Sequence, residues 1–270
     1  MDAARAEIGV FGGSGLYRLL DDVAFLAIET PYGVPSDDIA IGRAGDRMVA
    51  FMPRHGRKHT IPPAAINYRA NLWAMHSIGV NRVIAPTAAG SLQPHVKVGE
   101  LVITDQFIDR THGRPDTYFA EGPKVVHISA AEPYCPVLRA LAIQTAKAGE
   151  VAVHEHGTVV VIQGPRFSTR AESKWFSSMG WETVNMTQYP EAMLARELEM
   201  CYLNISLVTD YDAGLEGHPD VKPVSVEEVQ RSFAANTDRV RELILRLIPN
   251  IPAERQCPCA TALRDAAIGG

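Results

Sequence analysis

The sequence lacks an excess of basic residues, since 26 Lys and Arg stand against 31 Asp and Glu, for a net charge of -5. A nucleic-acid-binding protein normally shows a basic excess or patch, so nucleic acid is not an expected partner. Long apolar runs are also missing, and none reaches the roughly 18–20 residues that cross a bilayer. The first residues, MDAARAEIGVFGG, carry neither the apolar region nor the cleavage pattern of a signal peptide. We therefore expect a cytoplasmic protein without a membrane anchor.

Cysteine is scarce, with 4 residues in the chain. Cys135 and Cys201 each stand alone, and such a cysteine is most often a small buried apolar residue. Cys257 and Cys259 form a C-P-C sequence, which offers too few ligands for a zinc site. A disulfide between these two is possible but unusual in a reducing cytosol. The sequence therefore predicts no metal site and assigns no role to the C-P-C sequence.

The remaining composition, 46% hydrophobic and 21% charged, is ordinary for a globular protein of one or two domains. Short, continuously apolar runs typical of strands covered on both faces are Ile8–Phe11, Val49–Met52, Val83–Ala85, Leu101–Thr104, Val159–Ile162, Thr183–Asn185 and Leu203–Val208. Helical patterns alternate with them, at Pro62–Ser77, Pro136–Lys147, Thr169–Met179, Pro190–Met200 and Ser225–Leu247. This alternation predicts an α/β fold with a mixed, mainly parallel central sheet flanked by helices. No linker is visible, so we predict one domain over residues 1–270, in which 249–270 form a tail with a short helix near Ala260–Ala267.

Small, hydroxylated or charged residues follow most of the predicted strands. They occur in the sequences GGSG, PRHG, PTAAGS, QGPRFS, NMT and TDYD. Ligands of open α/β folds bind at the carboxyl ends of the strands. The pattern therefore predicts that these segments form a single site.

One part of this set suits phosphate. Glycines around Ser14 let backbone amides approach an anion, although GGSG is neither a dinucleotide fingerprint nor a P-loop and is equally compatible with a tight turn. Arg54 offers a planar guanidinium suited to phosphate, with a surface ion pair as the alternative. Thr87 and Thr187 add hydroxyls at two further strand ends. A metal site at His55 and His59 is disfavoured because Gly56 separates them and a third ligand is missing.

The other part of the set suits a purine. Phe167 can stack on a flat heterocycle or belong to the core. Asp210 can accept a hydrogen bond from an exocyclic amine or deliver a proton to a ring nitrogen. Asp212 points to the same side if the backbone stays extended. Phosphate at one end and adenine at the other would leave room for a ribose between them.

Several longer motifs identify a known family. The sequence resembles the 5′-methylthioadenosine phosphorylases, of the trimeric purine nucleoside phosphorylase class, from about Ile8 to Ile248, in the motifs GGSGL, RHGRKHT, NYRANLWA, DQFIDRT, HISAAEPYCP, QGPRFSTRAES, NMTQYPEAMLARE and VTDYD. The resemblance implies a single-domain phosphorylase fold, a homotrimer, and phosphorolysis of a nucleoside in purine and methionine salvage, without metal or cofactor. Inorganic phosphate would be the co-substrate.

The resemblance also implies roles for individual residues. Asp210 and Asp212 would act on adenine as the catalytic acids. Phosphate would be held by Ser14, Arg54, His55, Thr87, Ala88 and Thr187. The rest of the nucleoside would contact Met186 at the ribose, Phe167 and Ser168 at the base, and His59, Val226 and Val229 at the 5′ substituent, with His127 supplied by a neighbouring subunit.

Three other functions remain open. A purine nucleoside phosphorylase acting on adenosine or on 6-oxopurine nucleosides would use the same site. This alternative gains weight because many family members follow DYD with Cys-Trp, whereas here Ala213 and Gly214 lead into LEGHPDVKP near the expected 5′ pocket. A hydrolytic nucleosidase would not need the phosphate set. A nucleoside-binding protein without catalysis would keep the pocket but would not need Asp210 at N7.

Overall fold

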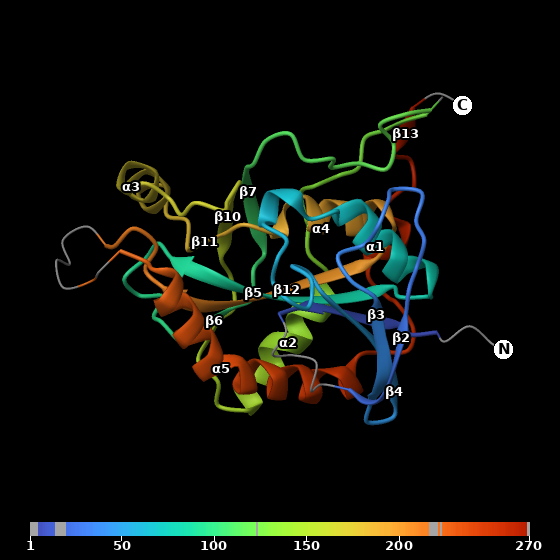
Figure 1. Cartoon of the computed structure of the whole chain (residues 1–270), viewed down its shortest axis with the longest axis horizontal. Coiled ribbons are helices and arrows are strands. Elements are labelled where there is room, and N and C mark those ends of the chain that lie inside the picture. Colours follow the sequence, from blue (N-terminus) through green and yellow to red (C-terminus); the bar gives the residue numbers. More distant parts are fainter. Residues whose placement is uncertain (1–4, 14–19, 123, 216–220, 222, 269–270) are drawn as a thin grey trace.

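The computed structural model describes residues 5–13, 20–122, 124–215, 221 and 223–268. A large twisted sheet lies between two layers of helices (Figure 1). Helices α2 (Pro136–Ala148) and α5 (Val226–Leu247) cover one face, and α1 (Tyr68–Ser77) and α4 (Gln188–Glu197) cover the other. The α/β fold predicted from the alternating pattern is confirmed.

The sheet has 11 strands among the described residues, and most of its pairs are parallel. Its main path runs β2-β3-β4-β1-β5-β11-β10-β7, and β12 pairs with β5. The strands are β1 (Ile8–Gly12), β2 (Asp21–Leu26), β3 (Ile39–Ala44), β4 (Arg47–Pro53), β5 (Arg82–Ser91), β6 (Leu101–Val102), β7 (Gln106–Arg110), β9 (Val153–His154), β10 (Thr158–Ile162), β11 (Thr183–Asn185) and β12 (Cys201–Asp210). A separate two-stranded sheet pairs β8 (Val125–Val126) with β13 (Ala267–Ile268).

Two apolar cores lie on the two faces of the sheet. On one face, Leu243 and Leu247 of α5 pack with Leu203 of β12. On the other, Leu72 of α1 and Leu194 of α4 belong to one buried cluster. The central strands are therefore buried on both sides, which explains why they read as continuous apolar runs in the sequence.

Local sequence accounts for the ends of the helices. The α5 helix begins after Ser225, whose hydroxyl accepts a hydrogen bond from the Glu228 amide at 3.2 Å. Helix α3 (Arg170–Ser178) begins with a full capping box, in which Thr169 and Glu172 each accept a bond from the other's backbone amide. Such caps satisfy amides that have no partner within the helix.

Some predicted elements differ from the structure. The expected helix at Ala260–Ala267 is wrong, because this segment contains a 3₁₀ turn, η4 (Pro258–Thr261), and then strand β13. Strands β2, β3 and β7 were not predicted; β2 is largely exposed and lacks a continuous apolar run. The helix expected from Pro62 is a 3₁₀ turn, η2 (Pro63–Ala65), separated from α1. A last 3₁₀ turn, η3 (Ile248–Asn250), follows α5.

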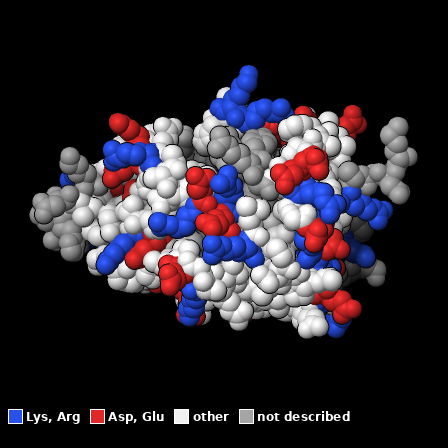
Figure 2. Space-filling model, turned by 90° about the horizontal axis from the view of Figure 1, so that it is seen from below, with Lys and Arg blue, Asp and Glu red and all other residues white. Residues whose placement is uncertain are grey.

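Charged side chains of both signs are interspersed on the face that carries α2 and α5 (Figure 2). On α5, for example, Arg246 bonds to Glu242 at 2.5 Å. Within the described ranges, no helix is both long and apolar enough to cross a membrane.

Candidate active site

The candidate site lies where β5 and β12 run side by side. These strands are parallel, and their register places Ser206 beside Thr87 and Asp210 beside Gly90. Thr87 and Gly90 are three residues apart on one strand, a separation of about 10 Å. One hydroxyl and one carboxylate are thus held at the two ends of a short length of sheet.

Asp210 ends β12 and is buried, with 5% of its surface exposed. Its Oδ2 accepts a hydrogen bond from the Thr209 hydroxyl at 2.7 Å, and its Oδ1 accepts one from the Asp212 amide at 2.8 Å. Burial raises the pKa of Asp210, the two hydrogen bonds oppose this, and the charges of Asp212 and Glu228 raise it further. The acid therefore takes up a proton at higher pH than an exposed aspartate does.

Gly90 gives Asp210 its space. A β-carbon at position 90 would lie 2.8 Å from Oδ1 of Asp210 and 3.2 Å from the Cβ and N of Asp212. The fold thus places this glycine against the two acids, a contact that local sequence does not reveal.

Asp212 differs from the extended arrangement considered in the sequence analysis. Its φ is 45°, because its amide turns back to the carboxylate of Asp210. The side chain lies by Ser168 and Ser173, and its Oδ2 has no hydrogen-bond partner among the described residues. Burial raises the pKa of Asp212, and the two serine hydroxyls lower it in part. The carboxylate is thus directed toward the segment after β10.

Thr87 is the centre of a buried polar network. Its Oγ1 accepts hydrogen bonds from Nδ2 of Asn204 at 3.1 Å and Nδ2 of Asn185 at 3.3 Å. A hydroxyl has two acceptor positions and one proton, so the amides leave the proton to be donated elsewhere. Ser206, at 3.4 Å, is one available acceptor, and an anion in the site would be another.

Strand β11 reaches Thr87 in an unexpected way. It pairs antiparallel with the distal end of β5, Thr183 lying beside Ser91, so that its own end at Asn185 lies back beside Thr87. The end of β11 thus reaches Thr87 although the two strands run in opposite directions. Furthermore, Thr87 and Ser91 lie within the long strand β5 and not in a loop after it. The site is formed where two strand directions meet.

Arg54 is buried and paired, which neither reading of the sequence anticipated. Its Nε and Nη2 donate to the two carboxylate oxygens of Glu191 at 2.6 and 2.8 Å, and Tyr202 also donates to Glu191 at 2.7 Å. Burial by itself would lower the pKa of Arg54, but the Glu191 carboxylate raises it. No described residue accepts a hydrogen bond from Nη1, the nitrogen that would be available to phosphate.

His55 is neutral at pH 7. Burial lowers its pKa to about 4, and the charge of Arg54 and the neighbouring His59 add to this effect. Its Nδ1 lies 2.8 Å from the Ile61 carbonyl oxygen. Because that oxygen can only accept, Nδ1 carries the proton and Nε2 is an acceptor. His59 stacks on His55 with ring centroids 4.5 Å apart.

Four of the predicted site residues follow β10 and β11, namely Met186, Phe167 and Ser168 of the expected nucleoside set and Thr187 of the expected phosphate set. Met186 packs against Gly164, where an added β-carbon would lie 2.7 Å from its sulfur. Thr187 precedes α4 and its hydroxyl makes no capping bond, so it can bind a ligand. Phe167 and Ser168 are half-buried in the segment before α3.

The other predicted site residues within the described part of the chain are half-buried or exposed. Ala88 is half-buried beside Thr87, Val229 is half-buried on α5, and Val226 is 60% exposed at the start of α5. His127 is exposed directly after β8, which pairs with β13 on the opposite side of Figure 1 from β10 and β11. Ser14 lies outside the described residues.

Several buried residues under the site were not singled out in the sequence. Glu191 holds the Arg54 guanidinium in place, and Asn185 and Asn204 orient Thr87. Thr104 donates to Asn204 at 2.7 Å and extends the network. Asn204 lies within an apolar strand sequence, and this interruption is the one local signal that could have identified it.

Comparisons with known proteins place this fold and site in one class. Residues 7–249 match the Phosphorylase superfamily, and the chain belongs to that family. It is 52% identical over 268 residues to a protein of Streptomyces coelicolor named purine nucleoside phosphorylase, covering 96% of this chain and 95% of that one.

Two further relatives carry the more specific name. S-methyl-5′-thioadenosine phosphorylase of Thermofilum pendens is 49% identical, over 98% of this chain and 99% of its own. The structure of methylthioadenosine phosphorylase from Schistosoma mansoni in complex with adenine has a TM-score of 0.90 and 36% identity, covering 96% of this chain and 98% of that one. The family identified from the sequence motifs is confirmed.

Proposed function

We propose that the chain catalyses phosphorolysis of 5′-methylthioadenosine. A phosphate oxygen forms a bond to C1′ while the bond from C1′ to N9 of adenine breaks, and its electron pair leaves with the base. The products are adenine and 5-methylthioribose 1-phosphate. The observation that carries this proposal is Asp210, a buried acid with a raised pKa that shares the β5–β12 pair with the buried Thr87 hydroxyl.

The proposed mechanism separates charge along the pocket. The ribose becomes cationic in the transition state, and bound phosphate stabilises it electrostatically. The departing purine becomes anionic, and a proton from Asp210 at N7 neutralises it. The raised pKa keeps Asp210 protonated at higher pH than usual, and Asp212 adds to that effect.

The phosphate end suits an ion that carries both charge and a proton. Arg54 supplies a fixed cation, and the Thr87 and Thr187 hydroxyls supply protons. Neutral His55 presents an unprotonated Nε2, which can accept a hydrogen bond from the P–OH group of hydrogenphosphate. Ser14 would complete this set.

Asp210 also favours adenine as the base. While its protonated oxygen faces N7, the other carboxyl oxygen of Asp210 accepts a hydrogen bond from the 6-amino group, whereas it repels the oxygen of a 6-oxopurine and is then left unmatched. The Streptomyces coelicolor relative named purine nucleoside phosphorylase supports the second candidate, a phosphorylase acting on adenosine or 6-oxopurine nucleosides.

The proposal extends to the setting of the reaction. The enzyme would work as a cytoplasmic homotrimer in purine and methionine salvage, with inorganic phosphate as co-substrate and without a metal or cofactor in the active site. Exposed His127, remote from its own chain's strand ends, would contact the 5′ pocket of a neighbouring subunit.

The test is adenine release from 5′-methylthioadenosine with and without phosphate, with adenosine and inosine assayed in parallel. Phosphate-dependent release that is fastest with the methylthio substrate is the expected result. Release without phosphate would identify a hydrolase, and preference for inosine would refute the role given to Asp210. Binding without turnover that is unaffected by Asp210→Asn would indicate a non-catalytic protein.

A further inference from the structure

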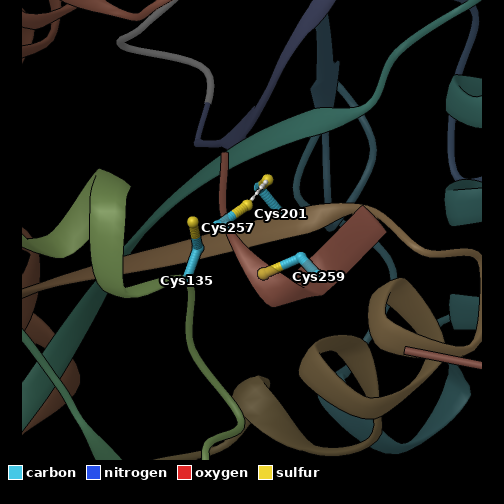
Figure 3. A group of neighbouring side chains, drawn as sticks. All are labelled: Cys135, Cys201, Cys257 and Cys259. Atoms are coloured by element: carbon cyan, nitrogen blue, oxygen red, sulfur yellow. Dashed lines mark hydrogen bonds between the residues drawn. The ribbon is translucent and has the colours of Figure 1, made fainter. Parts of the chain in front are cut away.

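Four cysteines from three parts of the chain lie together at the end of the sheet remote from Asp210. Cys135 precedes α2, Cys201 begins β12, and Cys257 and Cys259 flank the start of η4 (Figure 3). All four are buried, and their Sγ atoms lie within 4.8 Å of one another. Cys135 and Cys201 are buried as predicted, but they are not alone in space, because the fold joins residues far apart in the chain.

We propose that these four thiolates form a structural site for one tetrahedrally coordinated divalent metal ion. Zinc is the ion that a set of four cysteines favours. A zinc–sulfur distance of about 2.3 Å places the sulfurs of a tetrahedron about 3.8 Å apart. The observed separations, 3.2 Å between Cys201 and Cys257 and at most 4.8 Å for the other pairs, lie on either side of that value.

The arrangement is four-fold and not pairwise. Each of the four Sγ atoms lies within 4.8 Å of the other three, so Cys135 and Cys259 also approach the Cys201–Cys257 contact. A disulfide requires only that two sulfurs face each other. Convergence of all four sulfurs on a common space is what a tetrahedral ion requires.

The surroundings suit the net negative charge of such a site. Cys135 is the N-cap residue of α2, and a helix N-terminus stabilises a thiolate. Arg82 and Arg255 line the same recess as Cys135, Cys201 and Cys257. Two arginines and a helix N-terminus therefore border the recess of the cysteines, and their positive charge favours a dianionic metal–thiolate centre.

The site would tie the C-terminal segment to the body of the protein. Arg82 already binds this segment, through the Pro252 and Ala253 carbonyl oxygens at 2.7 Å. Beyond the cysteines the chain continues to Ala266, whose carbonyl accepts from the His127 amide at 2.9 Å. A metal would therefore hold the segment that positions β8.

The same geometry separates this site from the chemistry. Cys201 is the first residue of β12 and Asp210 is the last, so the strand places them about 30 Å apart. The ion would contribute to stability and not to catalysis.

The test uses the full chain, purified under reducing conditions and titrated with zinc. Metal is measured by mass spectrometry, and thermal unfolding is followed with and without a chelator. Cys257→Ser and Cys259→Ser are compared with Ala260→Ser, which adds a hydroxyl in the same turn and keeps all sulfurs. We expect close to one equivalent of zinc in the wild type and the control, and a loss of roughly tenfold or more in the cysteine variants.

Two further readouts accompany the metal content. The chelator should lower the melting temperature of the wild type and leave that of the cysteine variants unchanged. Cobalt bound in place of zinc should give the charge-transfer and visible bands of tetrahedral thiolate coordination. Turnover of the folded variants should match that of the wild type.

Three outcomes would overturn the proposal. One is a protein whose thiols are undetectable before reduction and which, once reduced, binds no zinc, because the cluster then forms disulfides. Another is a reduced protein with four free thiols that stays metal-free in the titration. The third is zinc retained by both serine variants, which would place the ion elsewhere.

Discussion

Replacement of Gly90 by alanine tests whether the position of Asp210 matters to the reaction. The new methyl carbon would lie 2.8 Å from Oδ1 of Asp210, whereas ordinary contacts of this kind begin at 3.4 Å. The carboxylate must therefore move by about 0.6 Å or tilt. The backbone at position 90 is paired on both sides, to β11 and β12, so the strand itself has little freedom to yield.

The expected effect is large on activity and moderate on stability. A displacement of about 1 Å at a reacting group can cost about 100-fold in rate, and an overpacked methyl costs about 1–3 kcal/mol. We expect kcat/KM for adenine release to fall by about 10- to 100-fold. The loss should be mainly in kcat, because the side chains around Thr87 that would bind phosphate are unchanged.

Gly9→Ala is the matched control. Its methyl would lie 2.8 Å from the Val80 side chain, an equal overlap on the buried strand β1. Both variants should lose similar stability in urea, and only Gly90→Ala should lose activity at a temperature where both are folded. If Gly90→Ala keeps wild-type kcat/KM, or if Gly9→Ala loses as much, the reasoning about Asp210 is refuted.

Three further substitutions have defined outcomes. Asp210→Asn should lower kcat by about 10²- to 10⁴-fold. The raised pKa of Asp210 means that its contribution to the stability of the fold falls as pH rises above the unfolded pKa of 3.8. The melting temperature of the variant should therefore rise relative to that of the wild type from acid to neutral pH, and a constant difference would contradict this. The pKa of His55 is about 4 in the folded protein and 6.5 in the unfolded chain, so its contribution to stability is complete above pH 6.5 and is lost as pH falls toward 4. In His55→Asn, the loss of unfolding free energy over this pH range should be smaller than in the wild type by about 3 kcal/mol. Urea unfolding across the range measures this difference. Glu191→Gln leaves the Arg54 charge unpaired and should lower the unfolding free energy by about 3–5 kcal/mol. The control, Glu242→Gln, breaks an exposed pair with Arg246 and should lower it little. Equal losses in the two variants would show that the buried pair contributes no more to stability than the exposed one.

Much of the fold was predictable because its central strands and amphipathic helices follow local rules. Strand β12 is a buried apolar run, and α5 begins at a serine cap. Exposed strand β2 has no such signal, and its place in the sheet depends on pairing with β3. The single-domain organisation over residues 1–270 stays a prediction.

The candidate site was predictable in its residue types more than in its geometry. Asp210 was identified from its place after an apolar run, and its burial and raised pKa agree with the role expected of it. The pairing of Arg54 with Glu191 joins residues that are 137 positions apart. No local pattern encodes such a contact.

The sequence by itself determined the family and the order of the central elements, and it pointed to acids and hydroxyls for the candidate site, because these depend on motifs and on side-chain periodicity. Only the tertiary structure decided that Gly90 makes room for Asp210 and that Asp212 turns away from an extended path. It also decided that Cys201 and Cys257, 56 residues apart, lie 3.2 Å from each other. The physical reason is that burial and pairing between distant segments arise when the sheet closes and the C-terminal segment packs on it, and a window of neighbouring residues carries no record of either event.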